Sequence, residues 1–420
     1  MGQVANKSLE LDKKNKRAVL LIILCWLVYT CSYLGKMGYS ANIVQFESFY
    51  GVSHSQSGTV STFFFFAYGV GQIINGIFCK KYNIKYFVLA SLIVSAVCNL
   101  TVGLAPAFNV IKYCWLINGL SLSVLWPTLI RLLSETLSKS QMPKAVVVMG
   151  TTVAIGTFLV YGLSALFVQF LHFRVIFYLA GILLPIIALL WALSFNLLTK
   201  NKAENEEQNE KIESKRLNKE ILISLAVFAF FAVVTNLTKD GLTTWVPSIL
   251  KELYHTPDSL SILLTLFLPI LAVFGTALAV NLYKKIKNFV TLCSLFFVAV
   301  AILIGVVVLF QNSGATVTLI SFSIISLLTS ASNNLITSML PLYWKDKINS
   351  GMIAGVLNGF CYVGSTVSSY GLGAVADVWG WTAVFWLLFG LTCLTFLIGF
   401  GYNIVLSLIN RRKADKALIN

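Results

Sequence analysis

Apolar runs long enough to cross a lipid bilayer recur from one end of this sequence to the other. A helix needs roughly 20 predominantly apolar residues to span a hydrocarbon core of about 30 Å. Backbone polar groups in that core must be paired within the chain, so repeated runs of this length favour helices. We count twelve runs, at residues 17–41, 57–79, 86–105, 109–135, 145–171, 174–198, 219–245, 258–283, 288–311, 315–340, 351–377 and 381–408. The sequence therefore predicts an all-α membrane protein with twelve transmembrane helices.

The composition excludes a soluble protein with an ordinary polar surface. Hydrophobic side chains make up 57% of the 420 residues, charged side chains make up 11%, and the mean hydropathy is +0.82. Soluble domains carry about 25% charged residues. The first apolar run follows several basic residues, as in a secretory signal, but it continues without a small-residue cleavage site. We therefore expect it to be retained as the first helix.

Basic residues are distributed unevenly between the two sides of the predicted membrane. Of the 31 lysines and arginines, 25 fall in alternate short loops and the two tails, three fall on the other side, and three lie within spans. This asymmetry follows the positive-inside rule, which places both termini in the cytoplasm. The net charge of +15 thus reflects membrane topology, and no nucleic acid partner is expected. We expect a multi-pass protein of the cell membrane, surrounded by the lipid bilayer.

The two halves of the sequence repeat each other. An offset of 203 residues aligns Lys36 with Lys239, and nearly the same offset aligns the lysine pairs after the second and eighth spans. Such repeats are typical of transporters that bind their substrate at the interface of two helix bundles. The predicted parts are a cytoplasmic tail at 1–16, a six-helix bundle at 17–198, an acidic cytoplasmic linker at 199–218, a second six-helix bundle at 219–408 and a cytoplasmic tail at 409–420.

Lys36 and Lys239 each place an ammonium group inside an apolar run. A charged side chain in the centre of a membrane helix costs about 2.5–3.5 kcal/mol on insertion scales, and it usually faces a polar cavity. Tyr29 and Tyr33 precede Lys36 on the same helical face. We expect the two lysines to form the floor of one anion site. The alternative is a lysine whose long side chain reaches to the outer membrane interface.

Two further ionisable residues, Arg131 and Asp240, lie within predicted spans. Asp240 points about 100° away from Lys239 around the helix. It is expected to pair with a cation across the bundle interface, to carry a coupling proton, or to form a structural ion pair. Arg131 lies one turn before Glu135, which favours a local salt bridge, with an inner gate as the alternative. Among polar residues of the second half, we place four in the cavity: Asn333, Asn334, Asn358 and Tyr362.

The sequence contains no pattern typical of an enzyme. The three histidines, His54, His172 and His255, fall in predicted outer loops without carboxylates or cysteines at catalytic or metal-binding spacing. A Walker loop is absent from the sequence as well. We therefore expect a protein that is not an enzyme, with no catalytic residue, no metal and no cofactor.

Several local patterns together resemble one transporter family, the organophosphate:phosphate antiporters of the major facilitator superfamily, which includes the glycerol-3-phosphate and hexose-phosphate carriers. The similarity extends over residues 17–408. In the first half it rests on tyrosines followed by a cation in the first span, an Ala-Tyr-Gly segment in the second, and a Trp-Pro followed by a basic residue in the fourth. In the second half it rests on a cation-x-Gly-x-x-x-Trp-x-Pro pattern in the seventh span, and on a tyrosine and an Asp-x-x-Gly-Trp ending in the eleventh. The residues are Tyr29, Tyr33, Lys36, Ala67, Tyr68, Gly69, Trp126, Pro127, Arg131, Lys239, Gly241, Trp245, Pro247, Tyr362, Asp377, Gly380 and Trp381.

The resemblance implies a carrier that exchanges a phosphate ester, such as glycerol-3-phosphate or a sugar phosphate, for inorganic phosphate by alternating access. In that family the cations on spans one and seven bind phosphate oxygens, which implies this role for Lys36 and Lys239. It also implies site positions for Tyr68 and Tyr362. A family histidine and a family lysine are replaced by Val153 and Gln72.

Two alternatives to phosphate exchange stay open. One is a proton-coupled symporter of a non-phosphate organic anion, with Asp240 as the proton site. The other is a transporter-like sensor of phosphate esters. We expect the protein to be a monomer.

Overall fold

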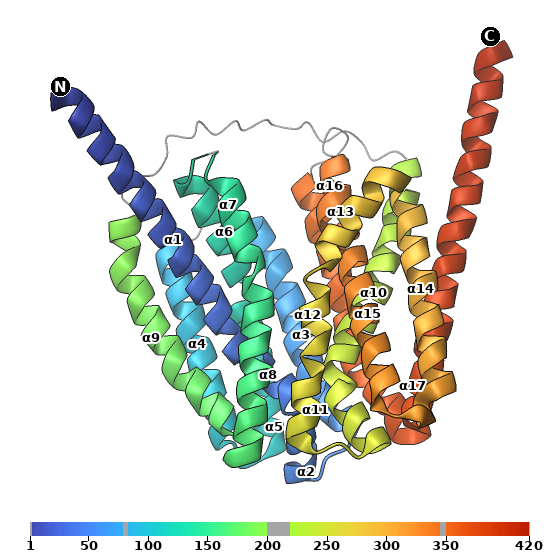
Figure 1. Cartoon of the computed structure of the whole chain (residues 1–420), viewed down its shortest axis with the longest axis horizontal. Helices are drawn as coiled ribbons and strands as arrows, with labels where there is room; N and C mark the ends of the chain where they lie inside the picture. Colours follow the sequence, from blue (N-terminus) through green and yellow to red (C-terminus); the bar gives the residue numbers. More distant parts are fainter. Residues whose placement is uncertain (1, 79–82, 139, 200–218, 345–349, 420) are drawn as a thin grey trace. The chain divides into compact units, whose positions relative to one another are not determined.

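The computed structural model describes residues 2–78, 83–138, 140–199, 219–344 and 350–419, and every regular element in these ranges is a helix (Figure 1). The predicted linker lies outside the described residues from 200 to 218. The helices of the first half are α1 (Gly2–Ala41), α2 (Ile43–Tyr50), α3 (His54–Phe78), α4 (Ile84–Leu104), α5 (Phe108–Leu122), α6 (Leu125–Thr136), α7 (Met142–Gly150), α8 (Thr152–Phe170) and α9 (Val175–Leu198).

The second half begins with a long helix and ends with another. Its elements are α10 (Lys219–Tyr254), α11 (Asp258–Thr265), α12 (Phe267–Ala272), α13 (Gly275–Ile286), α14 (Phe289–Phe310), the 3-10 turn η2 (Gln311–Ser313), α15 (Ala315–Asn334), the π-helical turn η3 (Leu335–Met339), α16 (Leu340–Tyr343) and α17 (Ser350–Ile419).

The observed helices agree with the expected twelve crossings. Ten segments of the described chain are long and apolar enough to cross a membrane. One of them, Met352–Leu408, contains two helices, because Gly380 interrupts α17 with a φ of 74° that a glycine adopts readily. Helix α3, with 25 residues, also has the length to cross. The prediction of an all-α membrane protein is confirmed.

Several predicted boundaries were wrong for identifiable reasons. Helix α10 continues to Tyr254 instead of ending at 245, because Pro247 is accommodated inside it. Helix α3 begins at His54, ahead of the predicted start at 57. Four predicted spans are also divided into shorter helices, at 123–124, at 151, at 266 and 273–274, and at the π-helical turn η3.

Two asparagine side chains cap the N-termini of helices. The side chain of Asn83 accepts a hydrogen bond from the backbone N–H of Lys85 at the start of α4. The side chain of Asn288 accepts one from the N–H of Thr291 at the start of α14. Both satisfy a backbone donor that has no partner within the helix. Each asparagine therefore sets the start of a span.

The described chain divides into two compact units, which we describe separately. Unit 1 comprises Met1–Tyr50 and Phe63–Lys211, and unit 2 comprises Gly51–Thr62 and Ile212–Asn420. The start of α3 thus packs with the second half of the chain although it belongs to the first half in sequence. The domain boundaries expected from the sequence stay a prediction.

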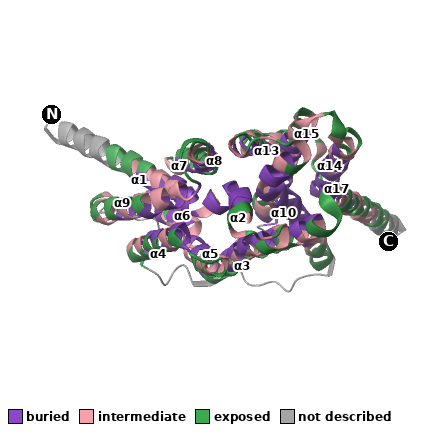
Figure 2. Cartoon of the chain, turned by 90° about the horizontal axis from the view of Figure 1, so that it is seen from below, coloured by how far each residue is buried: buried purple, intermediate pink, exposed green. Residues whose placement is uncertain are grey.

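Buried amides and small residues hold unit 1 together. The carbonyl oxygen of Gly35 in α1 accepts hydrogen bonds from Asn118 in α5, at 2.7 Å, and from Asn99 in α4, at 3.3 Å. Both asparagines are fully buried. Exposed apolar side chains cover outward faces such as that of α9 (green in Figure 2), as expected for contact with lipid.

Unit 2 is built on the packing of α10 against α17. A Cβ atom at Gly364 would come 2.1 Å from the carbonyl oxygen of Val233, so the two helices approach closely at this glycine. In the same core, the ring centroid of Phe231 in α10 lies 5.5 Å from that of Phe297 in α14, with the two rings tilted by 60°. Small residues at such contacts allow the backbones of membrane helices to pack.

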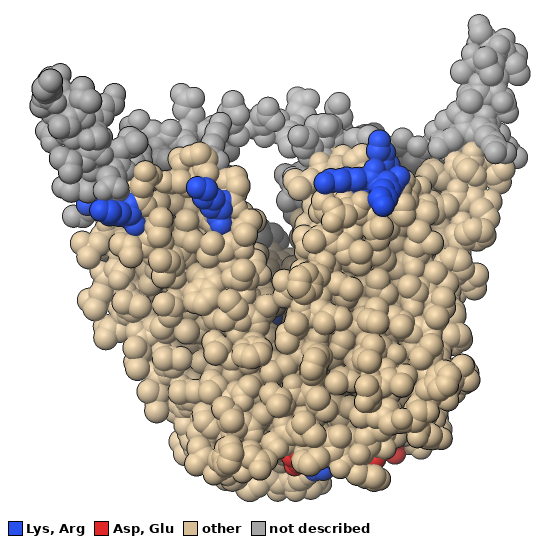
Figure 3. Space-filling view, viewed as in Figure 1, with Lys and Arg blue, Asp and Glu red and all other residues tan. Residues whose placement is uncertain are grey.

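Lysine and arginine side chains lie mostly at one end of each unit. Figure 3 shows them in blue at the upper end of both units on the face drawn. In unit 2 this end includes the exposed residues Lys284 and Lys285, in the last turn of α13, and Lys287, which caps that helix. Each unit therefore has the charge asymmetry that membrane proteins use for orientation.

Candidate functional site

In unit 1, the ammonium group of Lys36 lies against two tyrosine rings. The Nζ atom is 4.4 Å from the ring centroid of Tyr68 and 5.4 Å from that of Tyr33. Both tyrosines are at least nine-tenths buried, whereas Lys36 is half-buried. A cation over an aromatic face is stabilised by about 0.5–2 kcal/mol, more when it is removed from water. The rings therefore hold the lysine inside the span.

Tyr29 extends this cluster along α1. Its ring centroid is 5.7 Å from that of Tyr33 and 4.9 Å from that of Trp126 in α6. The structure thus brings together all four residues of the first half that we predicted to bind substrate: Tyr29, Tyr33, Lys36 and Tyr68. The spacing on α1 predicted the first three, and the resemblance predicted Tyr68. Their role in binding stays a prediction.

In unit 2, Lys239 forms an ion pair with its neighbour in the sequence. The Nζ atom of Lys239 is 3.7 Å from Oδ1 of Asp240, and the two side chains are 29% and 22% exposed. The other carboxylate oxygen of Asp240 accepts a hydrogen bond of 2.5 Å from Ser365 in α17. Among the described residues of unit 2, Asp240 therefore pairs with Lys239 itself. This ion pair was difficult to predict, because neighbouring residues of a helix point about 100° apart.

Polar residues of α10, α15 and α17 are connected to this ion pair through Ser365 and Cys361. The thiol of Cys361 donates to Oδ1 of Asn333 at 3.4 Å, and Asn236 also hydrogen-bonds to Cys361. Ser365, which donates to Asp240, also donates to the carbonyl oxygen of Cys361 at 3.2 Å. Asn236 and Asn333 therefore join this cluster through Cys361.

The remaining predicted cavity residues of the second half are Asn334, Asn358 and Tyr362. All three are half-buried. Asn358 and Tyr362 lie one turn apart on α17, and Asn334 is the last residue of α15 before the π-helical turn η3. Turns of this kind are frequent at functional sites.

Arg131 forms the local salt bridge that its spacing predicted. Its Nε atom lies 2.6 Å from Oε1 of Glu135, one turn later on α6. Both side chains are partly exposed, so the pair contributes little to stability. A gating role for Arg131 stays a prediction.

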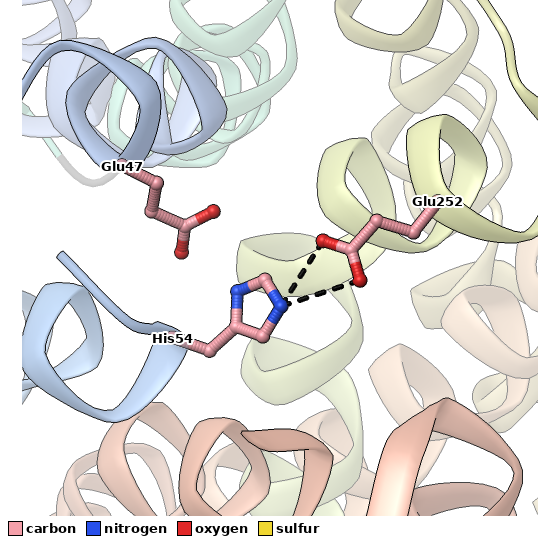
Figure 4. Close-up of side chains that lie close together, drawn as sticks. All are labelled: Glu47, His54 and Glu252. Atoms are coloured by element: carbon pink, nitrogen blue, oxygen red, sulfur yellow. Dashed lines mark hydrogen bonds and ion pairs between the residues drawn. The ribbon is translucent and has the colours of Figure 1, made fainter. Parts of the chain in front are cut away.

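A polar cluster in unit 2, around the start of α3, was not predicted from the sequence. Nε2 of His54 lies 3.0 Å from Oε1 of Glu252, and Figure 4 shows the two side chains pointing toward one another. Nε1 of Trp381 donates to Oε2 of Glu252 at 2.8 Å. The prediction that every histidine lies in a loop was therefore wrong for His54, which begins α3.

Asp377 holds the start of α3 in the same cluster. Its carboxylate accepts hydrogen bonds from the backbone N–H groups of His54, at 2.9 Å, and Ser55, at 2.8 Å. A carboxylate is favourable at a helix N-terminus because the first N–H groups there have no partner within the helix. This explains why the segment 51–62 packs with unit 2. The Asp-x-x-Gly-Trp pattern was the only signal of this contact in the sequence.

These features define a membrane transporter: many apolar crossings, two compact units, and Lys36 and Lys239, which each lie well inside a crossing helix of one unit. The chain belongs to the Major Facilitator Superfamily, whose sequence pattern matches residues 25–369. It is a multi-pass membrane protein and a transporter, and not an enzyme.

Two relatives are similar in sequence. A protein named "Probable hexose phosphate transport protein" from Chlamydia pneumoniae is 23% identical over 388 residues, which cover 80% of each chain. The "Membrane sensor protein UhpC" of Escherichia coli (strain K12) is 26% identical over 126 residues, which cover 30% of this chain and 28% of the sensor. The first similarity extends over most of both proteins, and the second over less than a third.

Solved structures of other transporters share the fold. A bacterial homologue of the human lysosomal transporter Spinster, in an inward-facing and occupied conformation, matches with a TM-score of 0.72 and 12% identity over 93% of this chain and 96% of that one. A POT family transporter in complex with 5-aminolevulinic acid matches with a TM-score of 0.74 and 11% identity over 90% and 94%. At these identities the likeness shows the fold alone.

Proposed function

We propose that this transporter exchanges a sugar phosphate or a related phosphate ester for inorganic phosphate by alternating access. The observation that carries the proposal is Lys36, held against the rings of Tyr33 and Tyr68 within α1. The similarity to hexose phosphate transport proteins over 80% of both chains supports a phosphate ester as the substrate. We further propose that the protein is a monomer in the cell membrane, with both termini in the cytoplasm.

In this proposal Lys36 and Lys239 each bind the anion. Lysine provides a compact positive charge with three rotatable donors, in contrast to the planar fork of arginine. Two cations that bind the same ligand repel each other when it is absent. A bound anion relieves that repulsion, so the empty carrier changes conformation slowly and exchange is favoured over net flux.

A panel of anions tests the substrate class. The purified protein is heated in detergent with inorganic phosphate, glycerol-3-phosphate, a hexose phosphate, the free hexose or a carboxylate. We expect the phosphate compounds to raise the melting temperature, because a ligand that binds only the folded state stabilises it. A stabilising effect of the free hexose or the carboxylate alone would contradict a phosphate ester as substrate.

Lys112 offers a matched control for this experiment. Its ammonium group also lies over a tyrosine ring, that of Tyr113 at 5.3 Å, but outside the proposed site. Lys36→Ala should remove the stabilisation by phosphate compounds, whereas Lys112→Ala should retain it. Equal loss in both variants would show that the effect is not specific to the site.

The similarity to a membrane sensor protein supports a second function, the detection of an external phosphate ester. Binding alone does not distinguish a sensor from a carrier. Robust exchange by the purified protein in liposomes would exclude the sensor. A proton symporter is the further alternative, and on that view Asp240→Asn would abolish pH-driven uptake yet leave exchange intact.

A further inference from the structure

We infer that Asp240 selects the charge of the transported anion, so that a singly charged ester is favoured over a doubly charged one. The inference rests on the proposed function, because it assumes that Lys239 binds the ligand. It begins with the ion pair of 3.7 Å between Lys239 and Asp240 in α10.

The two halves of the chain differ at this point. Lys36 is followed by Met37, whereas Lys239 is followed by Asp240. Unit 1 therefore adds a neutral side chain after its lysine, and unit 2 adds a carboxylate. The repetition of the two halves predicts a lysine at this position in each unit. It does not predict the carboxylate, which only unit 2 has at the following position.

Ser365 fixes the position of this carboxylate. Its hydroxyl group donates to Oδ2 of Asp240 at 2.5 Å from the neighbouring helix α17. Ser365 is 1% exposed, and its carbonyl oxygen accepts hydrogen bonds from Ser368, at 3.0 Å, and Ser369, at 2.9 Å. The carboxylate is therefore held beside Lys239 by a buried part of α17.

A ligand that reaches Lys239 also meets Asp240. Both side chains are partly exposed, at 29% and 22%, so neither is sealed inside the helix packing. Within a protein, charges a few ångströms apart interact much more strongly than in water. An anion that approaches the ammonium group is therefore repelled by the carboxylate beside it.

The charge balance gives the preferred form of the ligand. Lys239 and Asp240 together carry no net charge, so the charge of a ligand bound at Lys239 stays unbalanced beside this ion pair. A ligand with two negative charges leaves twice the excess charge that a ligand with one leaves. Burial of an unbalanced charge is unfavourable.

A pair of esters with the same sugar tests this inference. A hexose sulfate carries one negative charge. A hexose phosphate carries two at about pH 8, because its second proton dissociates at about pH 6. Half-saturating concentrations of both esters are measured by titration of the purified protein. We expect the wild type to bind the sulfate more tightly than the phosphate. In Asp240→Asn, the ratio should shift by about tenfold or more toward the phosphate.

Two further variants separate charge from structure. Asp240→Glu keeps the negative charge and should keep the wild-type ratio. Ser365→Ala removes the hydrogen bond but not the charge, so the sulfate should stay preferred by a smaller margin. The measured quantity is the ratio of the half-saturating concentrations of the two ligands. A smaller fraction of folded protein in a variant affects both ligands equally and leaves this ratio unchanged.

The outcomes distinguish this inference from the proposed function. If neither ester binds the wild type, the proposed function fails. If both esters bind and Asp240→Asn leaves their ratio unchanged, the inference about Asp240 is overturned while the proposed function survives. An unchanged ratio together with a loss of pH-driven uptake would instead identify Asp240 as a proton site.

Discussion

Replacement of Lys36 by alanine is expected to reduce phosphate-ester exchange by about 30-fold or more, because removal of one partner from a buried charge interaction costs about 2–5 kcal/mol. The ammonium group lies 4.4 Å from the ring centroid of Tyr68 and 5.4 Å from that of Tyr33, and alanine provides no positive charge at this position. The measurement is the initial rate of labelled ester uptake into liposomes that contain phosphate.

Lys239→Ala should cause the same loss of exchange and an additional loss of stability. The variant leaves the carboxylate of Asp240 without the ammonium group that lies 3.7 Å away in the wild type. An isolated charge that is partly removed from water is unfavourable. Lys36→Arg should keep substantial exchange, and Lys112→Ala should be unaffected. Wild-type exchange in Lys36→Ala would show that this lysine does not bind the substrate.

Gly364→Val is expected to prevent recovery of folded protein. A Cβ atom at this position would lie 2.1 Å from the carbonyl oxygen of Val233 and 2.9 Å from the backbone nitrogen of Leu237. These are backbone atoms of α10, so a change of side-chain rotamer cannot relieve the clash. The helices α10 and α17 must separate, and overpacking of a well-packed contact costs about 1–3 kcal/mol or more. The measurement is the yield of monodisperse protein in detergent, together with its melting temperature.

The same helix supplies a matched control for this substitution. A Cβ atom at Gly355 meets nothing within 4 Å, so Gly355→Val should be recovered in wild-type yield. The comparison keeps the residue change and the helix the same and varies only the contact. Equal recovery of both variants would contradict the close packing of α10 against α17.

Much of the fold could be predicted because bilayer thickness and hydropathy impose it. The apolar runs gave the helical class and the number of crossings, and the basic loops indicated a topology. The helix interruptions could not be predicted in this way. The runs at 109–135 and 315–340 were each predicted as a single span, and the structure divides them at 123–124 and at the π-helical turn η3.

The site residues were predictable where the signal is local. Spacing on one helix placed Tyr33 beside Lys36, and it also gave the salt bridge between Arg131 and Glu135. Contacts between distant segments were not predictable from spacing. The hydrogen bond from Ser365 to Asp240 joins residues 125 positions apart.

The cluster of His54 and Glu252 shows the same limit. The two residues are 198 positions apart, and each is unremarkable in its own segment. Their contact depends on the packing of the start of α3 with unit 2, which the repetition of the two halves does not imply. The sequence indicated Asp377 only as part of the Asp-x-x-Gly-Trp pattern, and it did not indicate the contact of Asp377 with the start of α3.

Counterflow in liposomes tests the central claim most directly. Purified protein is reconstituted into vesicles loaded with labelled inorganic phosphate, and efflux is measured after addition of external phosphate, a hexose phosphate or buffer alone. We predict slow efflux into buffer and rapid efflux when phosphate or the hexose phosphate is present outside. Efflux that is indifferent to both external anions would contradict phosphate exchange.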